Sequence, residues 1–325
     1  MRMKALISIF NNLQCVPNNH SGLEATYLSK KYDLYYIGKK GRTNKNEPKY
    51  LDIFETDLNK FNKIFLSLST PNFFGGILSN DTVEKIIKLC DYKGKVGILC
   101  NDPRIKPINA AKVVFERFNK LDIYQVDKFQ ELLDNATYLF PGKDLNKFYN
   151  DDKYNDFIYF DYFKEIFKEK IPSPQYVYNS KIYDVVYYGD RRGSYREKQL
   201  VKYMPESQEN LLVGFKTKKI NIPFIKKQKH KELLDVLNRA KVSLILSDEE
   251  HNDNVVTFRF YETLASNCLA AIPLEFDPNK ELIKDEVLKQ ILYIESKQDV
   301  IDLSGMYTEE LIKRQHSEYR RIMHV

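Results

Sequence analysis

Residues 248–265 combine charged side chains with a local pattern that anion-binding sites use. A polar loop is followed, from about Thr257, by apolar residues four positions apart, which predicts the start of a helix. Arg259 and Glu262 lie three positions apart and would project from one face of that helix. A guanidinium can bind phosphate oxygens through two N–H groups, and a carboxylate can accept hydrogen bonds from a vicinal diol. The pair therefore suits the diphosphate and ribose of a nucleotide; an ion pair within the helix is the alternative interpretation.

A second candidate anion site lies in residues 183–197, which read YDVVYYGDRRGSYRE. An apolar run of strand type precedes two glycines and three arginines, and a helical pattern follows. Glycines let the backbone approach a phosphate closely, and the N–H groups at a helix start favour an anion. The spacing matches neither the Walker loop nor the dinucleotide fingerprint, so it predicts a phosphate site without identifying the nucleotide.

Asp102 is the candidate catalytic carboxylate. It follows the apolar run at residues 95–100, and Pro103, which comes next, cannot continue the hydrogen bonding of a strand. A carboxylate just beyond a buried strand lies where α/β proteins bind their ligands, and it could accept a proton as a general base. The alternative is that Asp102 caps a helix or forms a turn.

Two adjacent aromatic residues, Phe73 and Phe74, follow another strand-like run at residues 63–68 and precede two glycines. Aromatic side chains at a strand end can contact a planar ligand. The alternative is that they cover the hydrophobic core.

The elements that must position these residues form two α/β halves. In the first half, strand-like runs occur at residues 4–10, 33–37, 63–68 and 95–100; in the second half they occur at residues 183–188, 210–215, 242–246 and 268–273. Helical patterns alternate with these runs, which predicts doubly wound parallel sheets that bind ligands beyond the carboxyl ends of their strands. Residues 171–180 contain two prolines and are the best linker candidate.

The bulk composition agrees with a two-domain protein. The chain has 325 residues, of which 43% are hydrophobic, so two sizeable cores can form. A net charge of +6 permits a polyanionic partner without requiring one. The four cysteines show no metal-ligand spacing and are typical of the reduced thiols of an intracellular protein. No apolar run approaches the length of a membrane span, so we expect no membrane partner.

Several segments together resemble the DNA β-glucosyltransferases of T-even phages, a family of two-domain glycosyltransferases with the GT-B fold. They occur in the family's order and at closely similar spacing across nearly the whole chain. The segments are residues 72–76, 101–104 with Pro107, 183–197, 248–266 and 275–277. The resemblance implies an α/β protein with two Rossmann-like doubly wound domains that face a central cleft. Residues 1–172, joined by the C-terminal helix 308–325, would bind the DNA acceptor, and residues 180–305 would bind the nucleotide-sugar donor.

The resemblance also implies an activity, the inverting transfer of glucose from UDP-glucose to the hydroxymethyl group of 5-hydroxymethylcytosine in duplex DNA. Asp102 would be the general base, with Glu24 near the sugar and the acceptor. Glu262 would accept hydrogen bonds from the ribose. The groups at the donor diphosphate would be Gly189, Asp190, Arg192, Arg196 and Arg259. The groups at the DNA, whose target base must leave the stack, would be Asn72, Phe73, Phe74 and Arg104.

The implied partners are double-stranded DNA that contains a hydroxymethylated pyrimidine and a UDP-sugar co-substrate. We expect a monomer in the cytoplasm of the infected host cell, where the modification would shield phage DNA from nucleases. No tightly bound cofactor is expected; Mg²⁺ or Mn²⁺ on the diphosphate is compatible with the sequence, with Asp190 as a candidate ligand.

Three positions depart from the family pattern, and they leave alternatives open. Asp190 stands where the family has a serine beside the diphosphate, His251 replaces a tyrosine, and Asn101 replaces a threonine. A different donor sugar, such as a pentose, or a different acceptor, such as 5-hydroxymethyluracil DNA or a surface glycan, would fit the same fold. A nucleotide- or DNA-binding module without activity is the non-enzymatic alternative.

Overall fold

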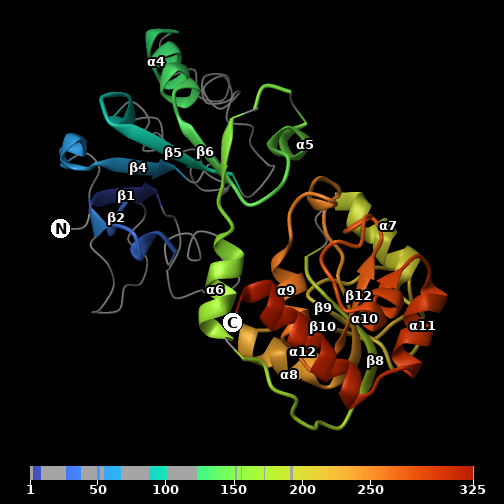
Figure 1. Ribbon diagram of the computed structural model, residues 1–325. Coiled ribbons are helices and arrows are strands. Elements are labelled where there is room, and N and C mark those ends of the chain that lie inside the picture. Colours follow the sequence, from blue (N-terminus) through green and yellow to red (C-terminus); the bar gives the residue numbers. More distant parts are fainter. Residues whose placement is uncertain are drawn as a thin grey trace. The chain divides into compact units, whose positions relative to one another are not determined.

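The chain divides into two units, Met1–Tyr162 and Phe163–Val325. The computed structural model describes residues 3–8, 27–37, 50–51, 55–66, 88–100, 123–150, 152–154, 156–171, 173–190 and 193–324 (Figure 1). The predicted residues Glu24, Asn72, Phe73, Phe74, Asp102, Arg104 and Arg192 lie outside these ranges.

The described part of the first unit contains a seven-stranded parallel sheet in the order β3-β2-β1-β4-β5-β6-β7. Its strands are β1 (Lys4–Ser8), β2 (Asp33–Ile37), β3 (Tyr50–Leu51), β4 (Lys63–Leu66), β5 (Lys95–Leu99), β6 (Thr137–Phe140) and β7 (Phe157–Tyr159). Helices α4 (Ile123–Asp134) and α5 (Leu145–Tyr149) flank β6, and a single 3-10 turn, η2 (Leu58–Lys60), precedes β4.

The central strands of this sheet are buried on both faces, which explains their nearly continuous apolar sequences. Ile64 and Phe65 of β4 and Ile98 of β5 are almost fully buried. Gly97 of β5 lies beside the Phe65 ring, where a Cβ atom would come within 2.8 Å of it. The strand-like runs predicted at residues 4–10, 33–37, 63–68 and 95–100 are thus confirmed in their described parts.

The described part of the second unit contains a six-stranded parallel sheet in the order β10-β9-β8-β11-β12-β13. Its strands are β8 (Tyr183–Tyr188), β9 (Leu211–Val213), β10 (Phe224–Ile225), β11 (Ala240–Leu244), β12 (Leu269–Pro273) and β13 (Tyr293–Ile294). Its helices are α6 (Tyr162–Lys170), α7 (Gly193–Tyr203), α8 (His230–Asn238), α9 (Phe258–Leu264), α10 (Glu286–Ile291), α11 (Lys297–Gly305) and α12 (Glu309–Met323), with a 3-10 turn, η4 (Glu249–His251). Both sheets therefore follow the doubly wound strand order of Rossmann-type domains, as predicted.

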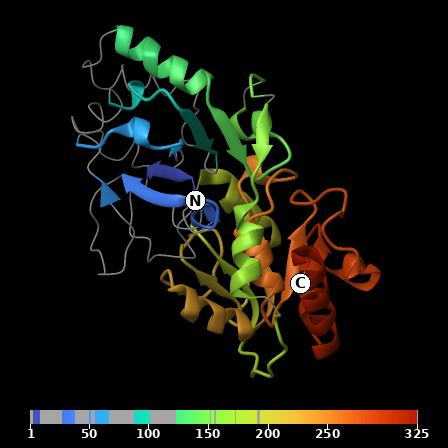
Figure 2. The ribbon, with the colours of Figure 1, turned by 60° about the vertical axis from the view of Figure 1, so that its left-hand side comes forward.

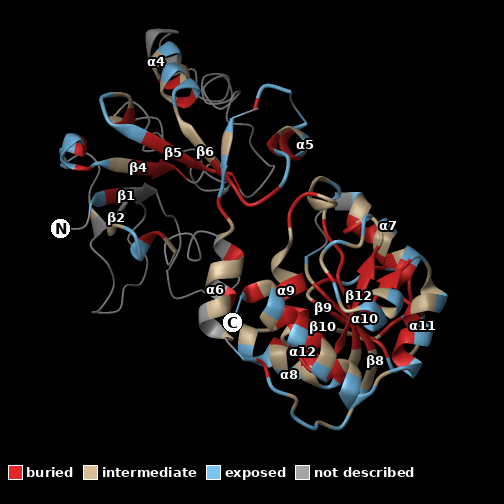
Figure 3. Ribbon diagram, in the orientation of Figure 1, coloured by how far each residue is buried: buried red, intermediate tan, exposed pale blue. Residues whose placement is uncertain are grey.

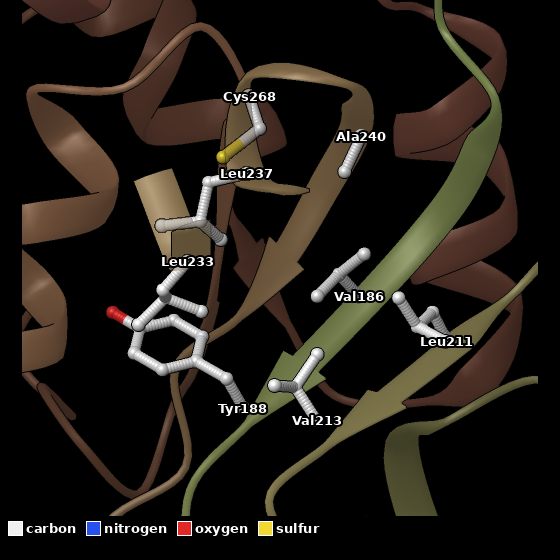
Figure 4. Packing of buried hydrophobic residues seen from close by; sticks show 8 residues of the cluster. All are labelled: Val186, Tyr188, Leu211, Val213, Leu233, Leu237, Ala240 and Cys268. Carbon is white, nitrogen blue, oxygen red and sulfur yellow. The ribbon is translucent and has the colours of Figure 1, made fainter. Parts of the chain in front are cut away.

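The core of the second unit packs α8 against the centre of its sheet. Leu233 and Leu237 of α8 contact a cluster that includes Val186 and Tyr188 of β8 and Val213 of β9 (Figure 4). The strands of this sheet are buried along most of their length, whereas the outer faces of the helices are exposed (Figure 3). Burying each such side chain contributes roughly 1.5–3 kcal/mol, so this cluster fixes β8 firmly.

Helix α12 is attached to the second unit by buried polar contacts. Gln315, which has no exposed surface, accepts a hydrogen bond from Ala270 N (2.9 Å) and donates to Cys268 O (2.8 Å). Tyr319 donates to Phe167 O of α6 (3.3 Å). Helix α12 lies beside α9 in both ribbon views (Figures 1 and 2). The contacts thus group residues 308–324 and most of α6 with the second unit, Phe163–Val325.

Other elements extend what the sequence indicated. The lysine-rich segment 216–231 contains the short strand β10 and buried residues such as Ile220 and Ile222, so part of it packs into the second unit. Residues 173–182 lack regular structure, and the segment 171–180 that the sequence suggests as a linker lies within the second unit, Phe163–Val325. Among the described helices, none is long and apolar enough to cross a membrane.

Candidate nucleotide-binding site

The candidate site lies where the strand order of the second sheet reverses. The chain leaves β8 for β9 on one side, whereas β11 pairs with β8 on the other side. In doubly wound sheets, this reversal leaves room for a ligand beyond the carboxyl ends of the two central strands. Gly189 follows β8, and the polar loop that begins near Asp248 follows β11. The two segments that the sequence singled out therefore come from neighbouring strand ends.

Gly189 is required by close packing at the end of β8. Its φ angle is +150°, and a Cβ atom there would lie 2.3 Å from Arg259 Nη2 and 3.0 Å from Tyr187 Oη. Gly214, at the end of β9 with φ +103°, packs against it in turn, because its Cβ atom would lie 2.6 Å from Gly189 O. The two glycines thus allow close packing of the strand ends and of Arg259, while their N–H groups donate to Val213 O and Ile225 O.

Arg259 links the ends of β8 and β11. Its Nε donates to Tyr188 O (2.8 Å), and its Nη1 donates to Leu246 O (2.6 Å). Burial opposes the charge of the guanidinium, but the nearby Tyr187, Tyr188, Asp248 and Glu262 raise its pKa, so it stays cationic. Its Nη2 is the group that lies against Gly189. A fixed cation therefore stands at the point where the strand order reverses.

Glu262 does not form an ion pair with Arg259, so the alternative interpretation of their spacing is wrong. Its side chain has no exposed surface, and its Oε2 accepts a hydrogen bond from Tyr188 Oη at 2.7 Å. Its Oε1 lies 2.8 Å from Nδ1 of His230, the first residue of α8. Burial, and then the Glu262 carboxylate, raise the pKa of Tyr188 well above its ordinary value.

Arg196 and Asp190 occupy the loop and helix that follow β8. The Arg196 side chain is 3% exposed, and its Nη2 lies 2.8 Å from Asp248 Oδ1 while its Nη1 donates to Asp190 O at 2.9 Å. The Asp190 carboxylate is half exposed and lies 3.6 Å from Lys227 Nζ. A lysine thus faces the Asp190 carboxylate and offsets part of its negative charge.

The site retains polar groups that the described protein does not satisfy. Four buried side-chain atoms around it lack a hydrogen bond to any described residue: Tyr187 Oη, His230 Nδ1, Thr257 Oγ1 and Glu262 Oε1. His230 Nδ1 and Glu262 Oε1 are close to each other but not aligned for a hydrogen bond. Buried polar groups without partners are rare in native proteins, so these atoms are available to ordered water or to a polar ligand.

The structure brings together Gly189, Asp190, Arg196, Arg259 and Glu262 at the ends of β8, β9 and β11. Sequence reasoning missed four residues that hold them: Tyr188, Lys227, His230 and Asp248. Asp248 opens the polar loop and could have been found as the partner of a buried arginine. Tyr188 and His230 carried no local signal, because their roles depend on the packing of α8 against α9 and β8.

A divalent cation would find few protein ligands in this site. Among the described residues, no group of three or more His, Cys, Asp or Glu side chains could hold one. Asp190 is half exposed and could complete a shell formed mainly by phosphate oxygens and water, as Mg²⁺ commonly requires. The residues therefore fit a metal carried by a bound diphosphate better than a resident metal.

Comparison with known proteins relates this geometry to one group of enzymes. No protein-family model matches the chain. The chain is 25% identical over 289 residues to the DNA beta-glucosyltransferase of Enterobacteria phage T4, which covers 81% of this chain and 79% of that protein. Its fold matches T4 phage BGT in complex with UDP-glucose (TM-score 0.72, 20% identity, 98% of this chain and 94% of the other). It also matches T4 phage BGT in complex with UDP and Mn²⁺ (TM-score 0.74, 21% identity, 98% and 94%).

A more distant match is an alpha-glucosyltransferase in complex with UDP and a 13-mer DNA that contains an HMU base (TM-score 0.55, 10% identity, 99% and 95%). Both kinds of enzyme match over nearly their whole length, so the likeness extends to the full two-domain fold. The chain thus has the GT-B fold and resembles, in sequence and in structure, the DNA β-glucosyltransferase of phage T4.

Proposed function

We propose that this protein is an inverting glycosyltransferase that moves glucose from UDP-glucose to the hydroxymethyl group of 5-hydroxymethylcytosine in duplex phage DNA. The observation that carries the proposal is the convergence of Gly189, Arg196, Arg259 and the buried Glu262 at the point where the strand order reverses. The similarity to a DNA β-glucosyltransferase over 289 residues supports it independently. The reaction would take place in the cytoplasm of the infected cell.

The donor half binds the nucleotide and stabilises the leaving group. The diphosphate lies beside the strand end at Gly189, and Arg259, which packs against this glycine and is already fixed by two carbonyl oxygens, needs no reorganisation to face it. Arg196 and Arg192 add positive charge that offsets the charge developing on UDP as the glycosidic bond breaks. Glu262 accepts hydrogen bonds from the ribose hydroxyls. A divalent cation on the diphosphate, with Asp190 as its protein ligand, would supply further charge neutralisation.

The acceptor half activates the hydroxymethyl group. Asp102 removes its proton as the oxygen attacks the anomeric carbon, the bond between that carbon and the UDP oxygen breaks, and the configuration inverts in one displacement. Glu24 would act beside the sugar and the acceptor. Asn72, Phe73, Phe74 and Arg104 would contact the DNA around a target base that has left the stack, since a base inside the duplex cannot enter an active site.

The test is a transfer assay with defined DNA and a panel of nucleotide sugars. The protein is incubated with each sugar and with duplex DNA that contains 5-hydroxymethylcytosine, 5-hydroxymethyluracil or only unmodified bases. The mass of each nucleoside is then measured after digestion. A gain of one hexose on 5-hydroxymethylcytosine with UDP-glucose is expected. Addition of a pentose or modification of 5-hydroxymethyluracil would correct the donor or the acceptor, and transfer only to a glycan would refute the proposal.

The role of Asp102 is tested by an Asp102→Asn variant. This change keeps the size of the side chain and removes the base, so transfer should fall by roughly 10²–10⁴-fold while UDP-glucose binding persists. Asp91→Asn, an exposed carboxylate of the same half, is the matched control and should retain full activity. A fully active Asp102→Asn variant would remove Asp102 from the base role.

A further inference from the structure

The Glu262 carboxylate is sealed from solvent although the proposed function requires it to meet a ribose. Its side chain is 0% exposed. One oxygen, Oε2, is held by Tyr188 Oη at 2.7 Å, and the other, Oε1, lies 2.8 Å from His230 Nδ1. A ribose hydroxyl can reach this carboxylate only if one of the two neighbouring side chains leaves its place.

Of the two neighbours, Tyr188 cannot move without disturbing the core. It belongs to the central strand β8, is 6% exposed and packs against Leu233 of α8 (Figure 4). His230 is different. Its side chain is 23% exposed, and it is the first residue of helix α8. The segment that joins β10 to this helix includes the exposed Lys226 and Lys227. Rotation of the imidazole toward solvent would uncover Oε1 and leave β8 in place.

We propose that His230 is a displaceable cover of the ribose-binding carboxylate, and that the ribose hydroxyls of the bound nucleotide take its place on Glu262 Oε1. The inference rests on the proposed function, because it concerns the same donor site. It adds a residue that sets how tightly the nucleotide is bound. His230 Nδ1 is poorly aligned with Oε1 and forms no hydrogen bond with it, so little energy is lost when a ribose hydroxyl replaces it.

The other groups that face Glu262 cannot act as such a cover. Arg259 is held by two backbone carbonyls, Tyr188 is fixed in the core, and burial raises the pKa of the Cys268 thiol to about 12, so this thiol stays neutral. Removal of the imidazole should therefore uncover Oε1 and raise nucleotide affinity.

The experiment is a calorimetric titration of the full-length protein with UDP-glucose at a single pH. His230→Ala removes the cover, so the dissociation constant of this variant should be roughly three- to tenfold lower than that of the wild type. In a Glu262→Gln background the same substitution should bring no such gain, because the carboxylate that His230 covers is gone. His324→Asn, which removes an exposed imidazole at the end of α12, is the matched control and should behave like the wild type.

Two results would overturn the inference. Equal affinities of the wild type and His230→Ala would show that the imidazole does not compete with the nucleotide, and weaker binding by the variant would show that His230 contributes to binding. Absence of UDP-glucose binding to both proteins would instead refute the proposed function, and with it the role of His230.

Discussion

At the scale of single residues, the donor site depends on side chains that are fixed before any ligand arrives. Arg259 donates to two backbone carbonyls, one at the end of β8 and one beyond the end of β11. Its guanidinium therefore has a structural task in addition to its proposed contact with a phosphate. Lysine has a single ammonium group and cannot span the same two acceptors with the same geometry.

Replacement of Arg259 by lysine should therefore weaken both folding and binding. One buried carbonyl would lose its partner, which costs about 1–3 kcal/mol of unfolding free energy. Urea unfolding of Arg259→Lys should show this loss, and UDP-glucose should bind at least tenfold more weakly. Arg239→Lys changes a half-exposed arginine that pairs with Asp235 and should change stability by less than about 0.5 kcal/mol. An unchanged midpoint for Arg259→Lys would show that its carbonyl contacts are dispensable.

Gly189→Ala should damage the same site through the backbone. The added methyl group would meet Arg259 Nη2 at 2.3 Å, at a φ angle of +150° that alanine rarely adopts. The strain should cost about 1–3 kcal/mol, and displacement of Arg259 should reduce UDP-glucose affinity more than tenfold. Gly305→Ala is the control, since nothing lies within 4 Å of its Cβ position at the end of α11. Equal affinities for the two variants would contradict a close backbone approach at Gly189.

The sequence could predict Gly189, Arg259 and Glu262 because their signal is local: a glycine after an apolar strand, and two charged residues on one helical face. It could not distinguish an Arg259–Glu262 ion pair from two independent roles, since the answer depends on Tyr188 and on carbonyls from two other strands. His230 was missed for the same reason. Its importance arises only when α8 packs beside α9.

At the scale of elements, α12 illustrates how a polar residue can attach a helix. The Ala270 N–H of β12 has no strand partner on the β13 side, because the register of β12 with β13 begins at Ile272. Gln315 supplies the missing acceptor and also donates to Cys268 O. A single amide therefore satisfies two backbone groups at the start of a buried strand.

Replacement of Gln315 by leucine should reduce the unfolding free energy by about 2–4 kcal/mol, because two buried backbone groups lose their partners. Thermal unfolding should show a lower midpoint with unchanged UDP-glucose stoichiometry in the folded protein. The control is Gln298→Leu, whose amide donates to an exposed Asp302 on α11 and should be nearly neutral. A similar effect of the two substitutions would show that α12 is held by its apolar face alone.

His316, one residue further along α12, makes this attachment dependent on pH. Burial, and to a smaller extent Arg320, lower the pKa of its imidazole, which lies 3.1 Å from Ser266 O. The unfolded chain binds a proton near the ordinary histidine pKa of about 6.5, whereas the folded chain resists it, so stability should fall as the pH drops below that value. Unfolding midpoints between about pH 8 and pH 5 should decrease in the wild type and decrease less in His316→Gln. An identical decrease in both proteins would assign the effect to other groups.

At the scale of the whole molecule, the two units repeat one strand order. The periodicity of the sequence predicted this repetition well, because buried parallel strands are short, apolar and regularly spaced. The limits of a unit carry no such periodic signal, because they depend on contacts between distant segments. Phe167 of α6 packs against Phe258 and Tyr261 of α9, and Tyr319 of α12 donates to Phe167 O, so α6 and α12 both belong to the packing of the second unit.

A fragment comprising residues 163–325 should consequently fold and bind UDP-glucose within a few-fold of the full chain, without transferring the sugar. Its contacts are self-contained, and Asp102 is missing from it. A fragment of residues 180–305 should fail to fold, because it lacks both α6 and α12 and would expose the apolar face of α9. Circular dichroism and calorimetry would separate these outcomes. A folded 180–305 fragment would restore the narrower domain that the sequence suggested.

The position of β8 in its sheet also has a consequence for synthesis on the ribosome. This strand is the first of its unit to emerge, yet it lies between β9 and β11, both of which are translated later. Its apolar sequence, YDVVYY, can pair with β9 once residue 213 has emerged, but its other edge stays open until residue 244 has left the exit tunnel. The first unit has the same arrangement around β1, which pairs with β2 and β4. Each unit thus exposes an open edge of its central strand during translation, and a chaperone that binds apolar segments would act in that period.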